Sequence, residues 1–152
     1  MEIKPMSWTV EYDCEISIIR STYVGQVTED EFKVDSGGRV TVHKVYNAID
    51  CGRAINPDII RAQTEGCIVF GLSAALTGEV KIENGRTTQS NFHDCPILTL
   101  KEAPHVETEI IQSGAAIGGI GELAVPPIFP AVTNAIYNAT GQRIRKLPVN
   151  SA

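Results

Sequence analysis

The sequence contains no two cysteines close enough to form a C-x-x-C pair. Its four cysteines, Cys14, Cys51, Cys67 and Cys95, lie far apart, and its three histidines also lack the spacing of metal ligands. Zinc and iron–sulfur sites are therefore not expected, and no metal held by protein ligands is predicted. We interpret the cysteines as buried free thiols.

Long apolar runs and an excess of basic residues are also missing. The longest weakly polar run, Cys67 to Leu76, is too short to cross a bilayer, so no membrane span is expected. The first residues lack the apolar core of a signal peptide. The net charge of −5 gives no general attraction to nucleic acid or to anionic membranes. We expect a soluble, cytoplasmic protein without a nucleic-acid partner, although export as part of a larger periplasmic enzyme stays open.

No G-x-S-x-G elbow, Walker loop or dinucleotide fingerprint lies between a predicted strand and a predicted helix. The 152 residues, 43% of them hydrophobic, fit one globular domain. Alternating apolar residues and turn signals predict strands over residues 8–18, 22–34, 39–49, 79–82, 86–89 and 106–110. Ser36-Gly37-Gly38 and Asn84-Gly85 predict antiparallel hairpins.

Two helices complete the predicted fold. Asn56 as N-cap and Pro57 at the first position predict a helix over residues 57–76, and the second runs from about Val125 to a C-cap at Gly141. The most apolar stripe of the first helix holds Ile60, Cys67, Phe70 and Ala74, with Gln63 on the same side. The fold class predicted is α+β, a single domain with mostly antiparallel strands and two main helices.

The chain is organised around the loop Gly118-Gly119-Ile120-Gly121-Glu122, which delivers one carboxylate towards the entry of the second helix. Glycines permit a tight turn and the close approach of a ligand to the main chain. Successive N–H groups in such a loop can bind an anion. Glu122 is therefore either a general base or a helix-entry charge that only stabilises the fold.

Several segments in order resemble the molybdopterin-binding large subunit of the xanthine dehydrogenase and aldehyde oxidase family, nearest to the isoquinoline 1-oxidoreductase beta-subunit type. The resemblance covers about residues 21–148 and is carried by 42–45, 48–53, 56–66, 70–72, 89–94 and 119–122. It corresponds to the C-terminal region of the family's large subunit. At Cys95 that branch more usually has a tyrosine, and the first twenty residues match less clearly.

The resemblance implies an activity and a site. Family members hydroxylate an aldehyde carbon or a carbon beside a ring nitrogen, with water as the oxygen source and a molybdopterin cofactor carrying the molybdenum. It implies that Glu122 is the general base, a role that needs an ionised carboxylate close to its proton. It further implies that Gln63 hydrogen-bonds the pterin, and that Gly119, Ile120 and Gly121 pass close to the cofactor.

The resemblance also implies missing parts. Family large subunits run to several hundred residues, and their upstream cofactor segments have no counterpart in residues 1–152. We expect this domain to belong to a larger subunit with a [2Fe-2S] small-subunit partner, and no cofactor tightly bound to the isolated chain. The alternatives are a non-catalytic folded interaction domain left from such an enzyme, and an unrelated α+β domain with a chance glycine loop.

Overall fold

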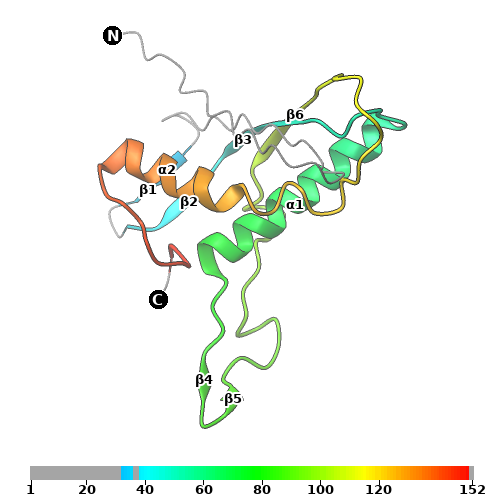
Figure 1. The fold of residues 1–152 in the computed structure, drawn as a ribbon. Helices are drawn as coiled ribbons and strands as arrows, with labels where there is room; N and C mark the ends of the chain where they lie inside the picture. Colours follow the sequence, from blue (N-terminus) through cyan, green and yellow to red (C-terminus); the bar gives the residue numbers. More distant parts are fainter. Residues whose placement is uncertain (1–31, 36–37, 151–152) are drawn as a thin grey trace.

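The computed structural model describes residues 32–35 and 38–150. This part of the chain has the predicted α+β composition: two helices pack against each other beside short strand pairs (Figure 1). In chain order the elements are β1 (Phe32–Val34), β2 (Val40–Val42), β3 (Lys44–Ile49), α1 (Pro57–Thr77), β4 (Ile82–Glu83), β5 (Arg86–Thr87), β6 (His105–Ile110) and α2 (Ile128–Thr140). The predicted strand over residues 8–18, and most of the one over 22–34, lie outside the described residues.

The strand pairing corrects the prediction of mostly antiparallel strands. β1 and β2 pair antiparallel as predicted, and so do β4 and β5 around Asn84 and Gly85, whose φ angles of 50° and 77° suit a tight two-residue turn. The longest ladder, however, is the parallel pair β3–β6, which runs from Lys44 opposite His105 to Ile49 opposite Ile110. A parallel pair needs a long connection, and here α1 and the β4–β5 hairpin provide it.

Helix α1 begins as predicted. The Asn56 side-chain oxygen accepts hydrogen bonds from the backbone N–H groups of Asp58 and Ile59, both at 3.2 Å. The predicted apolar stripe is wrong in part, because Phe70 is 68% exposed and Gln63 is exposed. Small and apolar residues occur on several sides of this helix, so composition alone does not select the buried face. The buried residues are Ile60, Thr64, Cys67, Ile68, Gly71, Leu72, Ser73, Ala75 and Leu76.

By length and composition α1 would also be able to cross a membrane, with a mean hydropathy of 1.2. The expectation drawn from Cys67 to Leu76 alone understated this apolar stretch. Half of the apolar stretch is buried inside the domain, and the core helix of a soluble protein has the same properties. The length and hydropathy of α1 are therefore only weak evidence for a membrane span. That the chain has no membrane span stays a prediction.

Helix α2 begins at Ile128, three residues later than predicted, because residues 123–127 form turns that include two prolines. It ends as predicted at Gly141, which is left-handed with φ 72° and donates its N–H to the Tyr137 carbonyl at 2.8 Å. The main hydrophobic cluster joins α1 and α2 to β2 and β3, with Ile68 fully buried at its centre. Packing between the helices thus supports the whole domain.

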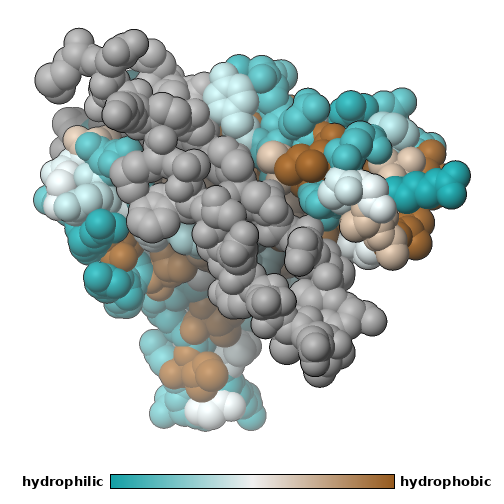
Figure 2. All heavy atoms as spheres, turned by 45° about the horizontal axis from the view of Figure 1, so that its top comes forward, coloured by the Kyte–Doolittle hydropathy of each residue, from teal (hydrophilic) through white to brown (hydrophobic). Residues whose placement is uncertain are grey.

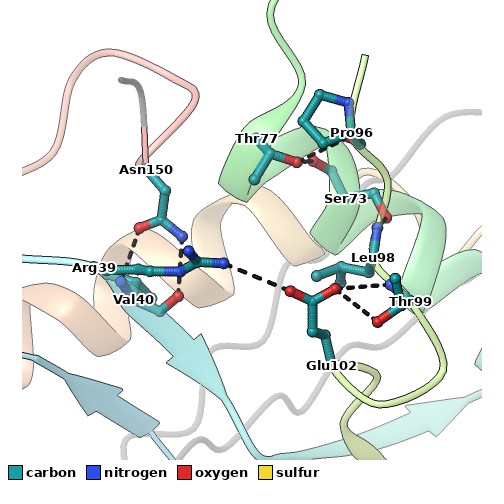
Figure 3. A network of polar contacts seen from close by, with 9 residues as sticks. All are labelled: Arg39, Val40, Ser73, Thr77, Pro96, Leu98, Thr99, Glu102 and Asn150. Atoms are coloured by element: carbon teal, nitrogen blue, oxygen red, sulfur yellow. Dashed lines mark hydrogen bonds and ion pairs between the residues drawn. The ribbon is translucent and has the colours of Figure 1, made fainter. Parts of the chain in front are cut away.

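The C-terminal segment returns to β2 and α1. Asn150 brackets the backbone of Val40: its Oδ1 accepts from the N–H at 2.8 Å and its Nδ2 donates to the carbonyl at 3.0 Å (Figure 3). The backbone N–H groups of Val149 and Asn150 donate to the carbonyls of Ala75 and Leu76 in α1. These bonds hold β2 against the end of α1.

A second set of contacts in Figure 3 fixes the segment that precedes β6. The Glu102 carboxylate accepts from the Thr99 N–H and hydroxyl at 2.9 Å and lies 3.5 Å from Arg39. The Thr99 backbone N–H above all holds the pKa of Glu102 below its ordinary value. Ser73 of α1 accepts from the Leu98 N–H at 3.1 Å. Arg39, Thr99 and Glu102 are among the residues that line a cavity of about 240 Å³ between β2, α1 and this segment.

The chain between α1 and β6 forms an arm that projects from the body of the domain (Figure 1). Its irregular part is ordered by Asp94, whose carboxylate accepts from the N–H groups of Asn91 and Ser90, and these bonds hold its pKa below the ordinary value. Hydrophobic surface shows at the projecting end (Figure 2). The exposed apolar residues of this arm are Val80, Ile82, Phe92, Ile97 and Leu100.

Candidate functional site

The site begins where β3 and β6 end. Because the two strands are parallel, their following segments leave the sheet at the same edge, so residues 50–56 meet residues 111–122. The Ile111 N–H still donates to the Ile49 carbonyl at 2.9 Å. Beyond it, the buried Asp50 carboxylate accepts from the Gly52 N–H at 2.9 Å and from the Ser113 hydroxyl at 2.8 Å. Asp50 thereby joins the two segments.

Gly52 explains why the glycine loop can lie so close to β3. Its φ is +68°, and a Cβ at this position would lie 2.0 Å from the Ala116 carbonyl oxygen. The chain around Ala115 and Ala116 therefore passes directly over it. Two residues later, the Gly118 N–H donates to the Cys51 carbonyl at 2.9 Å. The loop is thus fixed before it reaches its glycine-rich end.

The end of the loop is held by α1. The carbonyl of Gly121 accepts a short hydrogen bond from the Gln63 side-chain amide and a second from the Cys67 thiol, 3.2 Å away. The same Gln63 amide nitrogen lies 3.7 Å from the Cys67 sulfur. Gln63 and Gly121, two residues predicted to share one site, are therefore brought into direct contact.

Glu122 follows this contact but does not sit at a helix entry. It lies in a turn, its carbonyl accepts from the Val125 N–H at 3.0 Å, and α2 starts only at Ile128. The first turn of α2 contains no acidic residue. The side chain of Glu122 is exposed, and no donor to its carboxylate is found among residues 32–35 and 38–150. The predicted helix-entry position is thus wrong, and the carboxylate is left accessible.

Gly119 and Gly121 present open main chain. Neither has a positive φ, and a Cβ on either would meet no atom within 4 Å. Nothing among the residues that the structure describes therefore requires glycine at these two positions. Ile120 differs, because its side chain is half-buried against the smaller hydrophobic cluster of Ile49, Cys51, Ile60 and Ile110. At Ile120 the side chain therefore packs in part against the domain, and the backbone lies on the same open stretch as its neighbours.

Three residues that build this site were not selected from the sequence. Asp50, Ser113 and Cys67 all hold the loop, through contacts that join residues 54 to 63 positions apart. The only local signal was Asp50-Cys51-Gly52 at the end of a strand, which is a turn pattern. Cys51 and Cys67 are buried free thiols as interpreted, and Cys95 is half-buried. In the described part of the chain no cluster of potential metal ligands is found.

Gln63, Gly121 and Glu122 are all exposed, so the site lies open on the surface of the described structure. The best-formed cavity is the one near Arg39 and Glu102, and none of Gln63, Gly121 and Glu122 lines it. The residues that line that cavity therefore do not belong to the candidate site. One open wall carrying a carboxylate, an amide and bare backbone requires further walls from elsewhere.

The comparison with protein families gives a match to "Molybdopterin cofactor-binding domain" over residues 9–104. Gln63 lies inside the matched range, whereas the glycine loop and Glu122 follow it. The chain is 37% identical over 132 residues to isoquinoline 1-oxidoreductase subunit beta of Brevundimonas diminuta, covering 87% of this chain and 17% of that protein.

Two further proteins are similar to this chain over about the same share of its length. The membrane-bound aldehyde dehydrogenase of Gluconacetobacter polyoxogenes, whose name specifies pyrroloquinoline quinone, is 36% identical over 117 residues, covering 77% of this chain and 15% of that protein. The crystal structure of quinoline 2-oxidoreductase from Pseudomonas putida 86 superposes with a TM-score of 0.66 and 25% identity, covering 75% of this chain and 16% of that one. The chain thus spans less than a fifth of the length of the proteins it matches.

Proposed function

The chain belongs to the molybdopterin cofactor-binding domain family, and we propose that it forms one wall of the active site of a molybdenum hydroxylase. On this proposal residues 1–152 are the C-terminal domain of a larger molybdopterin-binding subunit. The complete enzyme hydroxylates an aldehyde or an N-heterocyclic carbon with oxygen from water. The names of the relatives, which contain an isoquinoline, a quinoline and an aldehyde, support these two substrate classes.

The open backbone at Gly119 and Gly121 fits a bulky group lying against the loop. A glycine that is required neither by its φ nor by contacts with the described residues can be explained by the approach of a group from outside. A Cβ at either position would project into the space where that group would lie. The pterin of the molybdenum cofactor is a flat group of suitable kind, and the main chain of Ile120 would border it.

Gln63 fits the edge of such a group in one orientation only. The Gly121 carbonyl is an acceptor, so the amide must turn its NH2 group towards it. The second amide hydrogen faces the Cys67 sulfur. The carbonyl oxygen of Gln63 is therefore the atom left for a ligand, and we propose that it accepts a hydrogen bond from a pterin N–H.

Glu122 is the proposed general base, and its carboxylate, which is exposed and has no partner among the described residues, carries this proposal. The bound cofactor supplies the two-electron oxidant and the position at which oxygen derived from water reaches the substrate. The task of Glu122 is to accept the proton that the attacking hydroxyl releases, which requires a carboxylate within hydrogen-bond reach. The bonds from Gln63 and Cys67 to Gly121 fix the peptide group that precedes this side chain.

The proposed partners are the rest of the large subunit and a small subunit carrying [2Fe-2S] clusters. The word "subunit" in the name of the isoquinoline relative supports a multi-subunit enzyme, and the iron–sulfur partner rests on the family resemblance. A small-molecule aldehyde or N-heterocycle would be the substrate.

The test is Glu122→Gln in the assembled enzyme. Glutamine keeps the size of the side chain but loses the basicity, and general bases contribute about 10²–10⁴-fold. We expect kcat to fall at least about 100-fold while molybdenum content, measured on the same preparation, stays at the wild-type level.

Glu109→Gln is the matched control, because this exposed carboxylate has no partner among the described residues and lies on β6. It should leave kcat unchanged. A Glu122→Gln enzyme with full molybdenum and near-normal turnover would contradict the role of the base. The absence of molybdenum from an active wild-type enzyme would contradict the proposed cofactor and favour a quinone instead.

A further inference from the structure

The inner face of the β3–β6 ladder contains a polar row in an otherwise apolar surface. The register places Asn47 of β3 directly opposite Thr108 of β6. The rows on either side are apolar, Val45 opposite Val106 and Ile49 opposite Ile110. An amide and a hydroxyl in the middle of this face need an explanation, because apolar residues would pack there without any polar requirement.

Helix α1 also carries a buried polar residue between apolar ones. Ile60 belongs to the same hydrophobic cluster as Ile49 and Ile110, and Cys67 belongs to the main cluster. Between them on α1 lies Thr64, which is 1% exposed and donates its hydroxyl to the Ile60 carbonyl at 2.8 Å. The oxygen of Thr64 keeps acceptor capacity. On α1, as on the ladder, a buried polar residue thus lies in sequence between members of the two hydrophobic clusters.

The side-chain polar atoms of Asn47 and Thr108 have no hydrogen-bond partner among the described residues. Asn47 is 4% exposed, and its Nδ2 and Oδ1, together with the Thr108 Oγ1, are closed from solvent and unpaired in the described structure. Buried polar side-chain atoms in proteins are almost always satisfied, and unpaired ones are costly. Three unpaired atoms on two opposed residues leave a group of donors and acceptors in need of one small partner.

We propose that Asn47 and Thr108 hold one buried water molecule. Such waters make about three hydrogen bonds to groups of this kind. The amide NH2 donates to the water, and the water donates to the amide oxygen or to the Thr108 hydroxyl. A surface hollow of about 460 Å³ includes Asn47 and Thr108 in its lining, so bulk water reaches the neighbourhood of the closed polar atoms.

The position of this water gives it a role in the candidate site. It lies two register pairs before Ile49 and Ile110, where both strands end and both site segments begin. A water that bridges the strands fixes their relative position at that edge. The inference concerns only the fold of this chain and holds whether or not Glu122 is a base.

The test uses the 152-residue chain and two measurements. A high-resolution crystal structure should contain one ordered water within hydrogen-bond distance of the Asn47 amide and the Thr108 hydroxyl. Thr108→Val keeps the shape of the side chain but removes the hydroxyl, so the water loses a partner. We expect this variant to lose the ordered water and to show a Tm lower by about 2–4 °C.

Two further variants separate the water from general packing effects. Thr108→Ser retains the hydroxyl and should retain the water. Thr133→Val is the control for the same substitution at a half-buried hydroxyl that already bonds to Phe129 of its own helix at 3.1 Å. A wild-type structure in which Asn47 bonds directly to Thr108 without a water would overturn the proposal. So would a Thr108→Val variant that is more stable than wild type, because that result marks an unpaired hydroxyl.

Discussion

Gly52 and Gly119 lie on the two segments that form the site, but glycine serves a different purpose at each. Gly52 has a left-handed backbone and lies beneath the Ala116 carbonyl, so both its conformation and its surroundings exclude a side chain. Gly119 has neither constraint in the part of the chain that the structure describes. The first glycine belongs to the fold, and the second is explained by the proposed cofactor.

We therefore expect alanine substitutions to separate the two. Gly52→Ala should destabilise the chain by at least about 1–2 kcal/mol, since the left-handed conformation alone costs that much. Gly119→Ala should leave stability within about 0.5 kcal/mol of wild type, yet lower the molybdenum content of the assembled enzyme. Urea denaturation of the isolated chain measures the first effect and metal analysis of the enzyme the second. A Gly52→Ala chain as stable as wild type would show that the loop does not pass over this residue.

At the scale of elements, short sequence motifs correctly predicted the helix start and the hairpin turn that depend on neighbouring residues. Asn56-Pro57 fixed the start of α1, and Asn84-Gly85 fixed the second hairpin, because capping and turn geometry depend on neighbouring residues. The pairing of β3 with β6 was not predictable in this way. Alternation of apolar residues reports which face of a strand is buried, but not the strand beside it or its direction.

The same distinction applies to the candidate site. The family resemblance singled out both Gln63 and Gly121, and the structure joins them through a hydrogen bond. The contacts of Asp50 with Ser113 and of Cys67 with Gly121 have no pattern in the sequence, since they depend on where the strands and α1 place distant segments. The exposure of Gln63 was also missed, because α1 is apolar on more than one side.

The β3–β6 ladder carries one cross-strand ion pair with a testable dependence on pH. The Nζ of Lys44 lies 2.6 Å from a carboxylate oxygen of Glu107. This hydrogen bond holds the pKa of Glu107 below its ordinary value of 4.5. The same bond, with a smaller contribution from Tyr46, raises the pKa of Lys44 above its ordinary value of 10.5. The pair therefore stabilises the ladder at neutral pH.

The directions of the two pKa shifts determine how stability should depend on pH. A lowered carboxylate pKa contributes stability above about pH 4.5 that is lost as pH falls through the folded-state pKa. A raised lysine pKa contributes stability below about pH 10.5 that is lost as pH rises through its folded-state value. Glu107→Gln should lower Tm at pH 7 in low salt, and the difference should vanish at about pH 3. It will be small, because the Glu107 side chain is 50% exposed. Glu109→Gln should show no such profile, and an equal loss at both pH values would refute the ion pair.

At the scale of the whole molecule, the described surface exposes several large apolar side chains, as expected of a domain that contacts other parts of a larger protein. Large apolar side chains are exposed at two ends, as Figure 2 shows for the projecting arm. Ile55, Ile59 and Ile117 are each more than 60% exposed near the glycine loop, and Phe92 and Leu100 are exposed on the arm. Exposed apolar side chains that gather on a surface are found at contact sites for other chains or domains. This agrees with a chain that spans 17% of its isoquinoline relative.

The isolated chain should therefore fail to retain the cofactor whose site it helps to build. On our proposal Gln63, the backbone of residues 119–121 and Glu122 would contact the cofactor from one side only, and binding affinity depends on groups that converge from several sides. We expect the chain, purified from a host that makes molybdopterin, to contain far less than one molybdenum per molecule and to show no turnover. Elemental analysis measures this directly, with the assembled enzyme from the same host as the positive control. Stoichiometric molybdenum on the lone chain would mean that this wall suffices for binding, and the proposed division of the site between domains would be wrong.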